Sequence, residues 1–318
     1  MTDFTRIVFF GTPEFAVGSL ENLIKEGFHI TAVVTAPDKP AGRGLKIKSP
    51  PVKDAALKHS LPVLQPVSLK DPLFQQQLLD LKPDLQIVVA FRMMPKSVWS
   101  LPPLGTFNLH ASLLPQYRGA APINHVLING ETETGVTTFF LEEHIDTGMI
   151  ILREGTPIYP DETAGELHDR LMNLGADLVV KSTRAIIKGE GERISQQELI
   201  VPGVELKTAP KILPGECRID WTKKAAEVFN FIRGMSPNPG AFTELMIKDG
   251  STMHLKILKA SYDIFTVDKT PGTVISDGRH FFKIACRDGM IAINRLQPSG
   301  KKQMESEEFL SGYGRLFS

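Results

Sequence analysis

The sequence has little cysteine and no excess of charge of either sign. Cys217 and Cys286 are the only two cysteines among 318 residues. Two thiols so far apart in sequence form neither a disulfide framework nor a CxxC metal site, and they are typical of a reducing compartment. Lysine and arginine number 36, as do aspartate and glutamate, so the net charge is zero. This balance excludes a uniformly basic nucleic-acid coat protein.

Long apolar runs are also missing. No stretch approaches the ~18 apolar residues of a membrane helix, and the first residues lead into a strand-like segment rather than a signal peptide. We therefore expect a cytoplasmic protein that binds no membrane. A chain of 318 residues is long enough for about two domains.

The first two-thirds of the chain alternate strand and helix patterns. Apolar runs bounded by turn residues predict strands, and near-helical spacing predicts the helices between them. The expected strands are 7–10, 30–34, 85–90, 106–110, 136–141 and 150–152, and the expected helices are 14–26 and 72–81. Thr163-x-x-Glu166 predicts the cap of a further helix. This is the pattern of an α/β domain with a Rossmann-like, mostly parallel sheet, to which we assign residues 1–188.

The pattern changes after residue 188. Glycine and proline punctuate 189–208, which predicts a linker. One helix pattern, about 222–233, opens a C-terminal domain that we assign to 209–318. Short strands with Asp-Gly turn signals follow it. We expect a small, OB-like β-barrel there, with a sandwich as the alternative.

The first turn argues against a dinucleotide cofactor. Residues 11–15 read Gly-Thr-Pro-Glu-Phe, with one glycine where the fingerprint G-x-G-x-x-G needs three. Pro13 also lacks the backbone N–H that would contact a pyrophosphate. The Rossmann-like sheet is therefore expected to bind no NAD.

Residues 107–122 hold the most informative pattern. Asn108 and His110 are two positions apart on an expected strand, so their side chains point to the same face. For an isolated pair, a buried structural histidine is the plain alternative. Asp146 lies in a second polar segment, between two strand patterns. A carboxylate that folds back onto His110 would fix the tautomer of its imidazole.

Asn108, His110 and Asp146 together would supply an oxyanion donor, a proton-handling group and an orienting carboxylate. No serine or cysteine nucleophile is placed among them, which favours direct attack of a substrate amine on a carbonyl. A metal site of His110, His144 and Asp146 is the competing use, since two histidines and a carboxylate match a facial triad. Their spacing does not require a metal, and we predict none.

The longer motif resembles the signature of the folate-dependent formyltransferases. Asn108-x-His110 is followed by Ser112-Leu113-Leu114-Pro115-x-Tyr117-Arg118-Gly119, with Asp146-Thr147-Gly148 downstream. The resemblance implies 10-formyltetrahydrofolate as formyl donor, an amine as acceptor, and Asn108, His110 and Asp146 at the reaction centre. It also implies a folate site formed by Ser112, Leu113, Leu114, Pro115, Phe91, Arg92 and Met93.

Matches to the family continue along nearly the whole chain. They include 11–16, 37–44, 62–66, 119–123, 209–212, 219–221 and 300–304. A match of this length resembles one branch of the family in particular. That branch formylates the α-amino group of methionyl initiator tRNA for translation initiation. Residues 90–95 depart from the family pattern, Ala-Tyr-Gly-x-Ile-Leu-Pro, because one residue and the glycine are missing. In the family this segment borders the pterin ring.

Two basic regions are candidates for tRNA contact. Residues 37–53 carry five cations and one acidic residue, and their prolines and glycines predict a connection without helix or strand. Arg43, Lys46 and Lys48 are the candidate phosphate ligands, with a solvated loop as the plain alternative. The second region is the C-terminal part of the chain. From Lys207 onward it has 17 Lys and Arg and 12 Asp and Glu, a net charge of +5, whereas the residues before Lys207 carry a net charge of −5.

A non-catalytic RNA-binding protein with a relic fold is the second functional alternative. The intact set of Asn108, His110 and Asp146 argues against it. We expect a monomer.

Overall fold

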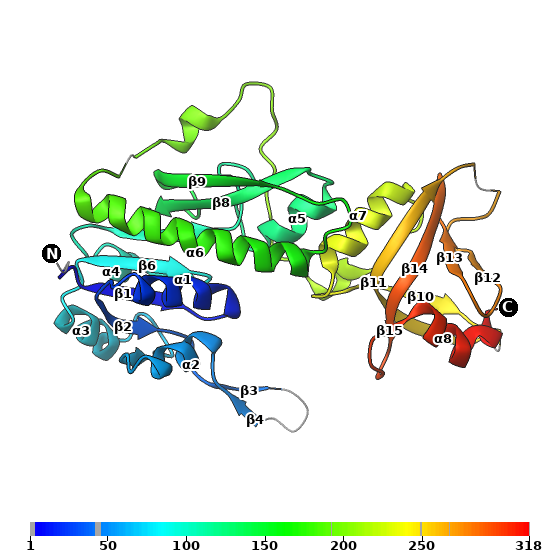
Figure 1. The fold of residues 1–318 in the computed structure, drawn as a ribbon, viewed down its shortest axis with the longest axis horizontal. Coiled ribbons are helices and arrows are strands. Elements are labelled where there is room, and N and C mark those ends of the chain that lie inside the picture. The colour runs from blue at the N-terminus through cyan, green and yellow to red at the C-terminus, as the bar shows by residue number, and fades with distance from the viewer. Residues whose placement is uncertain (1–3, 42–45, 192, 249, 267, 318) are drawn as a thin grey trace. The chain divides into compact units, whose positions relative to one another are not determined.

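The computed structural model describes the chain except for residues 1–3, 42–45, 192, 249, 267 and 318, and the side chains of 41 and 46. The described chain divides into two compact units (Figure 1). The first comprises Met1–Gly119, Thr134–Thr156 and His168–Thr208, and the second comprises Ala120–Glu133, Pro157–Leu167 and Ala209–Ser318. Residues 189–208 are thus part of the first unit.

A seven-stranded sheet forms the centre of the first unit. Its order is β5-β2-β1-β6-β7-β8-β9, parallel from β5 to β7 and antiparallel between β7 and β8. The strands are β1 (Ile7–Gly11), β2 (Ile30–Val34), β5 (Val63–Leu64), β6 (Leu85–Val89), β7 (Thr106–His110), β8 (Glu133–Phe140) and β9 (Ile150–Pro157). The predicted α/β class with a mostly parallel sheet is confirmed.

Helices cover both faces of this sheet. They are α1 (Glu14–Lys25), α2 (Pro51–Lys58), α3 (Pro72–Asp80), α4 (Lys96–Trp99) and α6 (Ala164–Lys188). On one face Val88 of β6 packs in a cluster with residues of α3 and α4. On the other face Leu109 of β7 lies so close to α6 that a Cβ on Gly175 would be 2.6 Å from its Cδ2. Asn108 pairs with Val88 across β6 and β7, so Asn108 and His110 share the face opposite α6.

The strand order reverses between β1 and β6. The chain runs outward from β1 through β2 to β5, then returns to β6 and continues to β7. In open α/β sheets, ligands bind at the carboxyl ends of the strands beside such a reversal. Residues 91–95 and 111–119 follow β6 and β7, so they lie at that edge of the sheet.

The expectation that prolines keep 37–53 free of helix and strand is wrong. β3 (Lys39–Ala41) and β4 (Lys46–Lys48) form an antiparallel hairpin, and α2 begins at Pro51. Each strand of a two-stranded ribbon has a free edge, which tolerates the missing N–H of Pro40. The first helical position also needs no N–H donor, so proline begins helices readily.

An antiparallel sheet and three helices form most of the second unit. The sheet order is β10-β11-β14-β13-β12, with β15 paired to β14. The elements are α5 (Pro122–Ile128), α7 (Ala225–Met235), β10 (Ala241–Met246), β11 (Thr252–Ile264), β12 (Val274–Ser276), β13 (Phe282–Ala285), β14 (Gly289–Pro298), β15 (Met304–Glu305) and α8 (Ser306–Tyr313). Short 3-10 turns are η1 (Gln196–Leu199), η2 (Pro214–Cys217) and η3 (Gly314–Leu316), of which η1 belongs to the first unit.

An apolar cluster stabilises the second unit. Ile257 and Ile291 of the sheet pack in it with Ile232 of α7 and Phe309 of α8.

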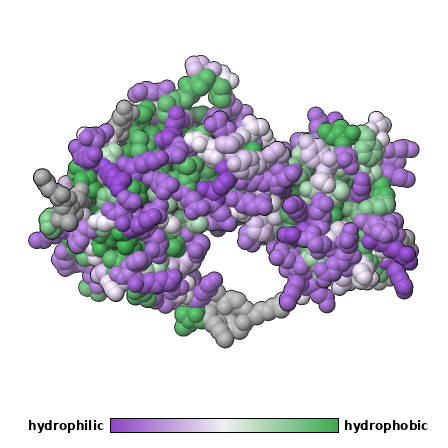
Figure 2. Space-filling view, in the orientation of Figure 1, coloured by the Kyte–Doolittle hydropathy of each residue, from purple (hydrophilic) through white to green (hydrophobic). Residues whose placement is uncertain are grey.

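Hydrophilic side chains cover much of the surface on the face that Figure 2 shows. In the part of the chain that is described, no helix is both long and apolar enough to cross a membrane.

The predicted capping box is present at the start of α6. The backbone N–H and the hydroxyl of Thr163 both donate to Glu166 Oε2 at 2.8 Å, and Glu166 N donates to Thr163 Oγ1 at 3.3 Å. These bonds from Thr163, first that of its backbone N–H, lower the pKa of Glu166 below its ordinary value of 4.5.

We predict that Thr163→Ala lowers the free energy of unfolding by about 1 kcal/mol at pH 7, whereas Thr163→Ser, which keeps the hydroxyl, does not. Urea unfolding of the three proteins measures the difference.

A carboxylate with a lowered pKa stabilises the fold above its unfolded pKa and loses that effect as the pH falls through its folded pKa. The stability difference between wild type and Glu166→Gln should therefore shrink as the pH falls below 4.5. Urea unfolding between pH 7 and pH 3 measures it, and a difference independent of pH would contradict the capping role.

Candidate active site

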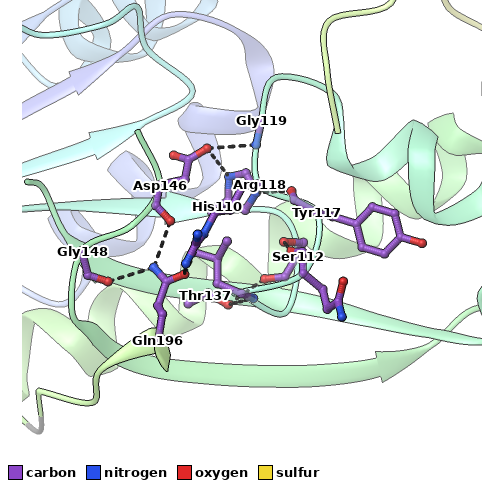
Figure 3. Close-up of polar contacts among 11 residues, drawn as sticks. His110, Ser112, Tyr117, Arg118, Gly119, Thr137, Asp146, Gly148 and Gln196 are labelled. Carbon is purple, nitrogen blue, oxygen red and sulfur yellow. Dashed lines mark hydrogen bonds and ion pairs between the residues drawn. The ribbon is translucent and has the colours of Figure 1, made fainter. Parts of the chain in front are cut away.

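His110 lies at the end of β7, the last parallel strand of the sheet, and is only 6% exposed. Its Nε2 is 2.8 Å from the carbonyl oxygen of Tyr117 (Figure 3). Because a carbonyl can only accept, Nε2 carries the hydrogen of this bond. Nδ1 is then the nitrogen that faces the rest of the site. The Tyr117 backbone has a φ of 60°, which is unusual for a residue with a side chain.

Asp146 reaches His110 from the loop that follows β8. Its carboxylate accepts a hydrogen bond from the N–H of Gly119 at 3.0 Å, and its Oδ2 lies 3.9 Å from His110 Nδ1. The Asp146 backbone has a φ of 55° in the left-handed region. A Cβ on Gly148 would stand 1.7 Å from the carbonyl oxygen of Phe140, so only glycine lets the loop return to the sheet here.

The Asn108 side chain completes a polar cluster at the end of β7. It is half-buried, and it points to the same face as His110 because the two are separated by one residue on the strand. Among the described residues, none forms a hydrogen bond to the Asn108 amide or to His110 Nδ1. Both groups are therefore available to a ligand, as an amide donor and an imidazole beside a carboxylate.

Thr137 of β8 holds the loop that contains the first group of predicted folate residues. Its hydroxyl donates to the carbonyl of Ser112 at 2.6 Å and accepts from the N–H of Leu114 at 3.1 Å. Ser112, Leu114 and Pro115 are buried, and Leu113 is half-buried. This segment therefore presents backbone and the Leu113 side chain, rather than the Ser112 hydroxyl, which donates to the carbonyl of Gln116.

The second group of predicted folate residues follows β6, the neighbouring strand. Phe91 is half-buried with its ring 5.5 Å from that of Phe10, whereas Met93 is 74% exposed. The Arg92 guanidinium donates to the carbonyls of Pro66 and Val67 at 2.5 and 2.8 Å. Arg92 thus ties the segment to the chain after β5, while Phe91 and Met93 offer apolar surface.

Gln196 is a residue of this cluster that the sequence pattern did not indicate. It lies in the segment predicted to be a linker, and it is 2% exposed. Its Oε1 accepts from the Arg118 guanidinium, and its Nε2 donates to the carbonyls of Asp146 and Gly148. These partners lie 48 to 78 positions away. No local spacing could have distinguished Gln196 from a solvated glutamine.

Two of the three candidate tRNA ligands belong to the β3–β4 hairpin. Arg43 lies outside the described residues, and Lys46 and Lys48 are in β4, where Lys48 is exposed. Lys53 is paired with Asp38 at 2.6 Å. Hydrogen bonds from Gln65 and then from Lys53 lower the pKa of that carboxyl. Lys53 is therefore already neutralised, and the positive charge is concentrated on the hairpin.

No metal-binding group of three or more His, Cys, Asp or Glu side chains is present among the described residues. His144, which shares its loop with Asp146, is exposed.

Family models match both parts of the chain. One described as formyl transferase covers residues 5–183, and one described as formyl transferase, C-terminal domain, covers residues 211–314. A relative from Bacteroides fragilis, named methionyl-tRNA formyltransferase, is 50% identical over 308 residues. The match spans 97% of this chain and 95% of the relative.

Solved structures share the fold at much lower identity. An N-formyltransferase from Helicobacter canadensis, in complex with folinic acid and dTDP-3-aminofucose, has a TM-score of 0.65 and is 22% identical, over 94% of this chain and 100% of its own. HypX from Aquifex aeolicus, in complex with tetrahydrofolic acid, has a TM-score of 0.63 at 18% identity. The likeness covers 97% of this chain but only 47% of HypX. By the two family models and the Bacteroides relative, this chain belongs to the formyl transferase family.

Proposed function

We propose that this chain transfers a formyl group from 10-formyltetrahydrofolate to the α-amino group of methionyl initiator tRNA, for translation initiation. The observation that carries the proposal is the Asp146 carboxylate 3.9 Å from His110 Nδ1, beside an Asn108 amide that is available to a ligand. Family membership and the name of the 50% identical relative support the reaction and its acceptor. The bound donor supplies the formyl carbon and a tetrahydrofolate leaving group.

In this proposal Asn108 and His110 stabilise the oxygen of the formyl group during attack. Negative charge develops on that oxygen as the amine adds to the formyl carbon, and each preorganised hydrogen-bond donor is typically worth roughly 2.7–4 kcal/mol. The bond from His110 Nε2 to the Tyr117 carbonyl leaves Nδ1 for this oxygen. Nδ1 donates to it from the protonated imidazole, which carries a hydrogen on both ring nitrogens. Asn108 reaches it from the same face of β7.

Asp146 handles the proton that the attacking amine must lose. Its carboxylate faces His110 Nδ1 and orients the imidazole. It accepts the amine proton through a water molecule, and a proton then passes from the site to the departing folate nitrogen. One N–C bond forms and one breaks, so the side chains return to their starting state.

The residues after β6 and β7 fit a flat folate ring. Phe91 and Met93 provide apolar surface at the edge of the sheet, and Thr137 fixes the backbone of Ser112–Pro115 beside them. We assign Leu113 to direct contact. Arg92 supports the site by holding its segment to the 66–67 carbonyls.

Two basic regions are proposed to bind the tRNA backbone. One is the basic segment 37–53, with Arg43, Lys46 and Lys48 as the proposed phosphate ligands. The other is the C-terminal sheet, which we propose to be a small OB-like barrel, because such folds bind nucleic-acid strands. The excess of five positive charges from Lys207 onward supports this surface. We further propose that the protein acts as a monomer in the cytoplasm, where its tRNA substrate is charged.

We predict that His110→Ala and Asp146→Ala each reduce kcat by at least about 100-fold, while thermal unfolding shows that both variants are still folded. Residues that act as one unit are non-additive, so the double variant should be little worse than either single one. The measurement is tetrahydrofolate release with charged initiator tRNA, run beside an amino-sugar nucleotide and glycinamide ribonucleotide as alternative acceptors. Near-wild-type kcat in either variant would overturn the catalytic assignment.

Met93→Asp should raise the KM for the formyl donor several-fold and leave the KM for tRNA unchanged. A carboxylate placed on the apolar surface beside Phe91 has to be desolvated when the folate ring binds. Met246→Asp is the matched control, because Met246 is 77% exposed on β10. If the two variants gave the same donor KM, residues 91–93 would not border the folate.

Replacing Arg43, Lys46 and Lys48 with alanine should flatten the salt dependence of tRNA binding, by roughly 0.7–0.9 in slope for each phosphate that these side chains neutralise. Donor KM and thermal stability should stay near wild type. The control replaces three exposed lysines of the same unit, Lys25, Lys58 and Lys70. Equal slopes for wild type and the hairpin variant would leave the tRNA contact to the C-terminal unit alone.

A further inference from the structure

We infer that Gln196 is a positioning residue for formyl transfer, which sets the place of the Asp146 carboxylate relative to His110. The inference rests on the proposed function, since it assumes that Asp146 takes part in the reaction. Gln196 lies outside the sheet, in the 3-10 turn η1, and reaches the site only through its side chain (Figure 3).

The Gln196 amide uses its full hydrogen-bonding capacity within the site. Oε1 accepts from Arg118 Nε at 3.0 Å and from Nη2 at 2.5 Å, and Nε2 donates to the carbonyls of Asp146 and Gly148 at 2.9 Å each. An amide oxygen has two lone pairs and the NH₂ group has two donors, so every position is used. Neither a carboxylate nor an apolar side chain can reproduce this pattern.

These four bonds join the two segments that hold the carboxylate. Asp146 and Gly148 lie in one loop, and Arg118 directly precedes Gly119, whose N–H donates to the Asp146 carboxylate. The left-handed φ of 55° at Asp146 persists only where surrounding contacts fix it. Gln196 supplies such a contact from a third part of the chain.

Gln196 is itself anchored to the sheet. Ile194 and Ile150 exchange two backbone hydrogen bonds, of 2.9 and 3.0 Å, at the start of β9. The hydroxyl of Ser195 then accepts from the N–H of Gln197 and begins the 3-10 turn. The position of the amide is therefore set by the same sheet that carries His110.

The separation of 3.9 Å between Asp146 Oδ2 and His110 Nδ1 makes the site sensitive to this placement. It is longer than a hydrogen bond, so a small shift of the loop decides whether the carboxylate can engage the imidazole or the incoming amine. A displacement of about 1 Å in a reacting group can cost about 100-fold in rate.

The first test compares Gln196→Met with Gln197→Met, its exposed neighbour. Gln196→Met should lower kcat by about 10- to 100-fold and leave the KM of donor and tRNA within about twofold, whereas Gln197→Met should match wild type. Gln196→Glu keeps the acceptor oxygens for Arg118 but cannot donate to the two carbonyls. Its kcat should be as low as that of Gln196→Met. Restored activity in Gln196→Glu would overturn the inference, because Gln196 would then only anchor Arg118.

The second test places Gln196→Met in the Asp146→Ala background. If Gln196 acts through Asp146, Gln196→Met should not lower kcat any further in this background. If Gln196 has a general structural role, kcat should fall again by the same factor, and that result would overturn the inference. Thermal unfolding of each variant shows that it is folded, and Gln196→Glu replaces Gln196→Met in this cycle if the latter is not. Full kcat in Asp146→Ala would refute the proposed role of Asp146. Full kcat in Gln196→Met beside an inactive Asp146→Ala would refute only the inference.

Discussion

The burial of a polar group at the end of β7 constrains the loops around it. His110 is 6% exposed, and a buried imidazole without partners would be costly. The carbonyl of Tyr117 satisfies Nε2, and this requires the chain to turn back through a left-handed residue just after the strand. The same turn brings the N–H of Gly119 to the Asp146 carboxylate. One reversal of the chain therefore satisfies the imidazole and provides a partner for the carboxylate.

Two glycines let neighbouring segments pack closely, and this fixes the positions of the Asp146 loop and of α6. Gly148 lets the Asp146 loop return against Phe140, and Gly175 lets α6 lie against Leu109 on the opposite face of the strand. With α6 on that face, the face of Asn108 and His110 is the one left for the polar cluster. Thr137 then fixes the loop after β7 to β8 through the backbone of Ser112 and Leu114. The polar cluster is thus supported by small residues and backbone bonds more than by other charges.

Much of the fold could be predicted because its signals are local. The strand 106–110 and the strand 30–34 have the bounds that their apolar runs predict, and the Thr163 capping box joins residues only three positions apart. The wrong prediction at 37–53 has the same origin. Proline composition alone predicts neither strand nor helix there, although a ribbon edge at Pro40 and a helix start at Pro51 both accept the residue. Those environments depend on neighbours that a local pattern does not contain.

By itself, the sequence determined that Asn108 and His110 share one face, because the two-residue period of a strand fixes the direction of each side chain. It also contained the motif that resembles the formyltransferases. Only the tertiary structure decided the 3.9 Å between Asp146 Oδ2 and His110 Nδ1. It also decided the hydrogen bonds of Gln196, whose partners lie 48 to 78 positions away in the sequence. The reason is physical: side-chain direction on a strand is a local property, whereas the meeting of two loops and a distant glutamine depends on how strands, helix and turns pack together.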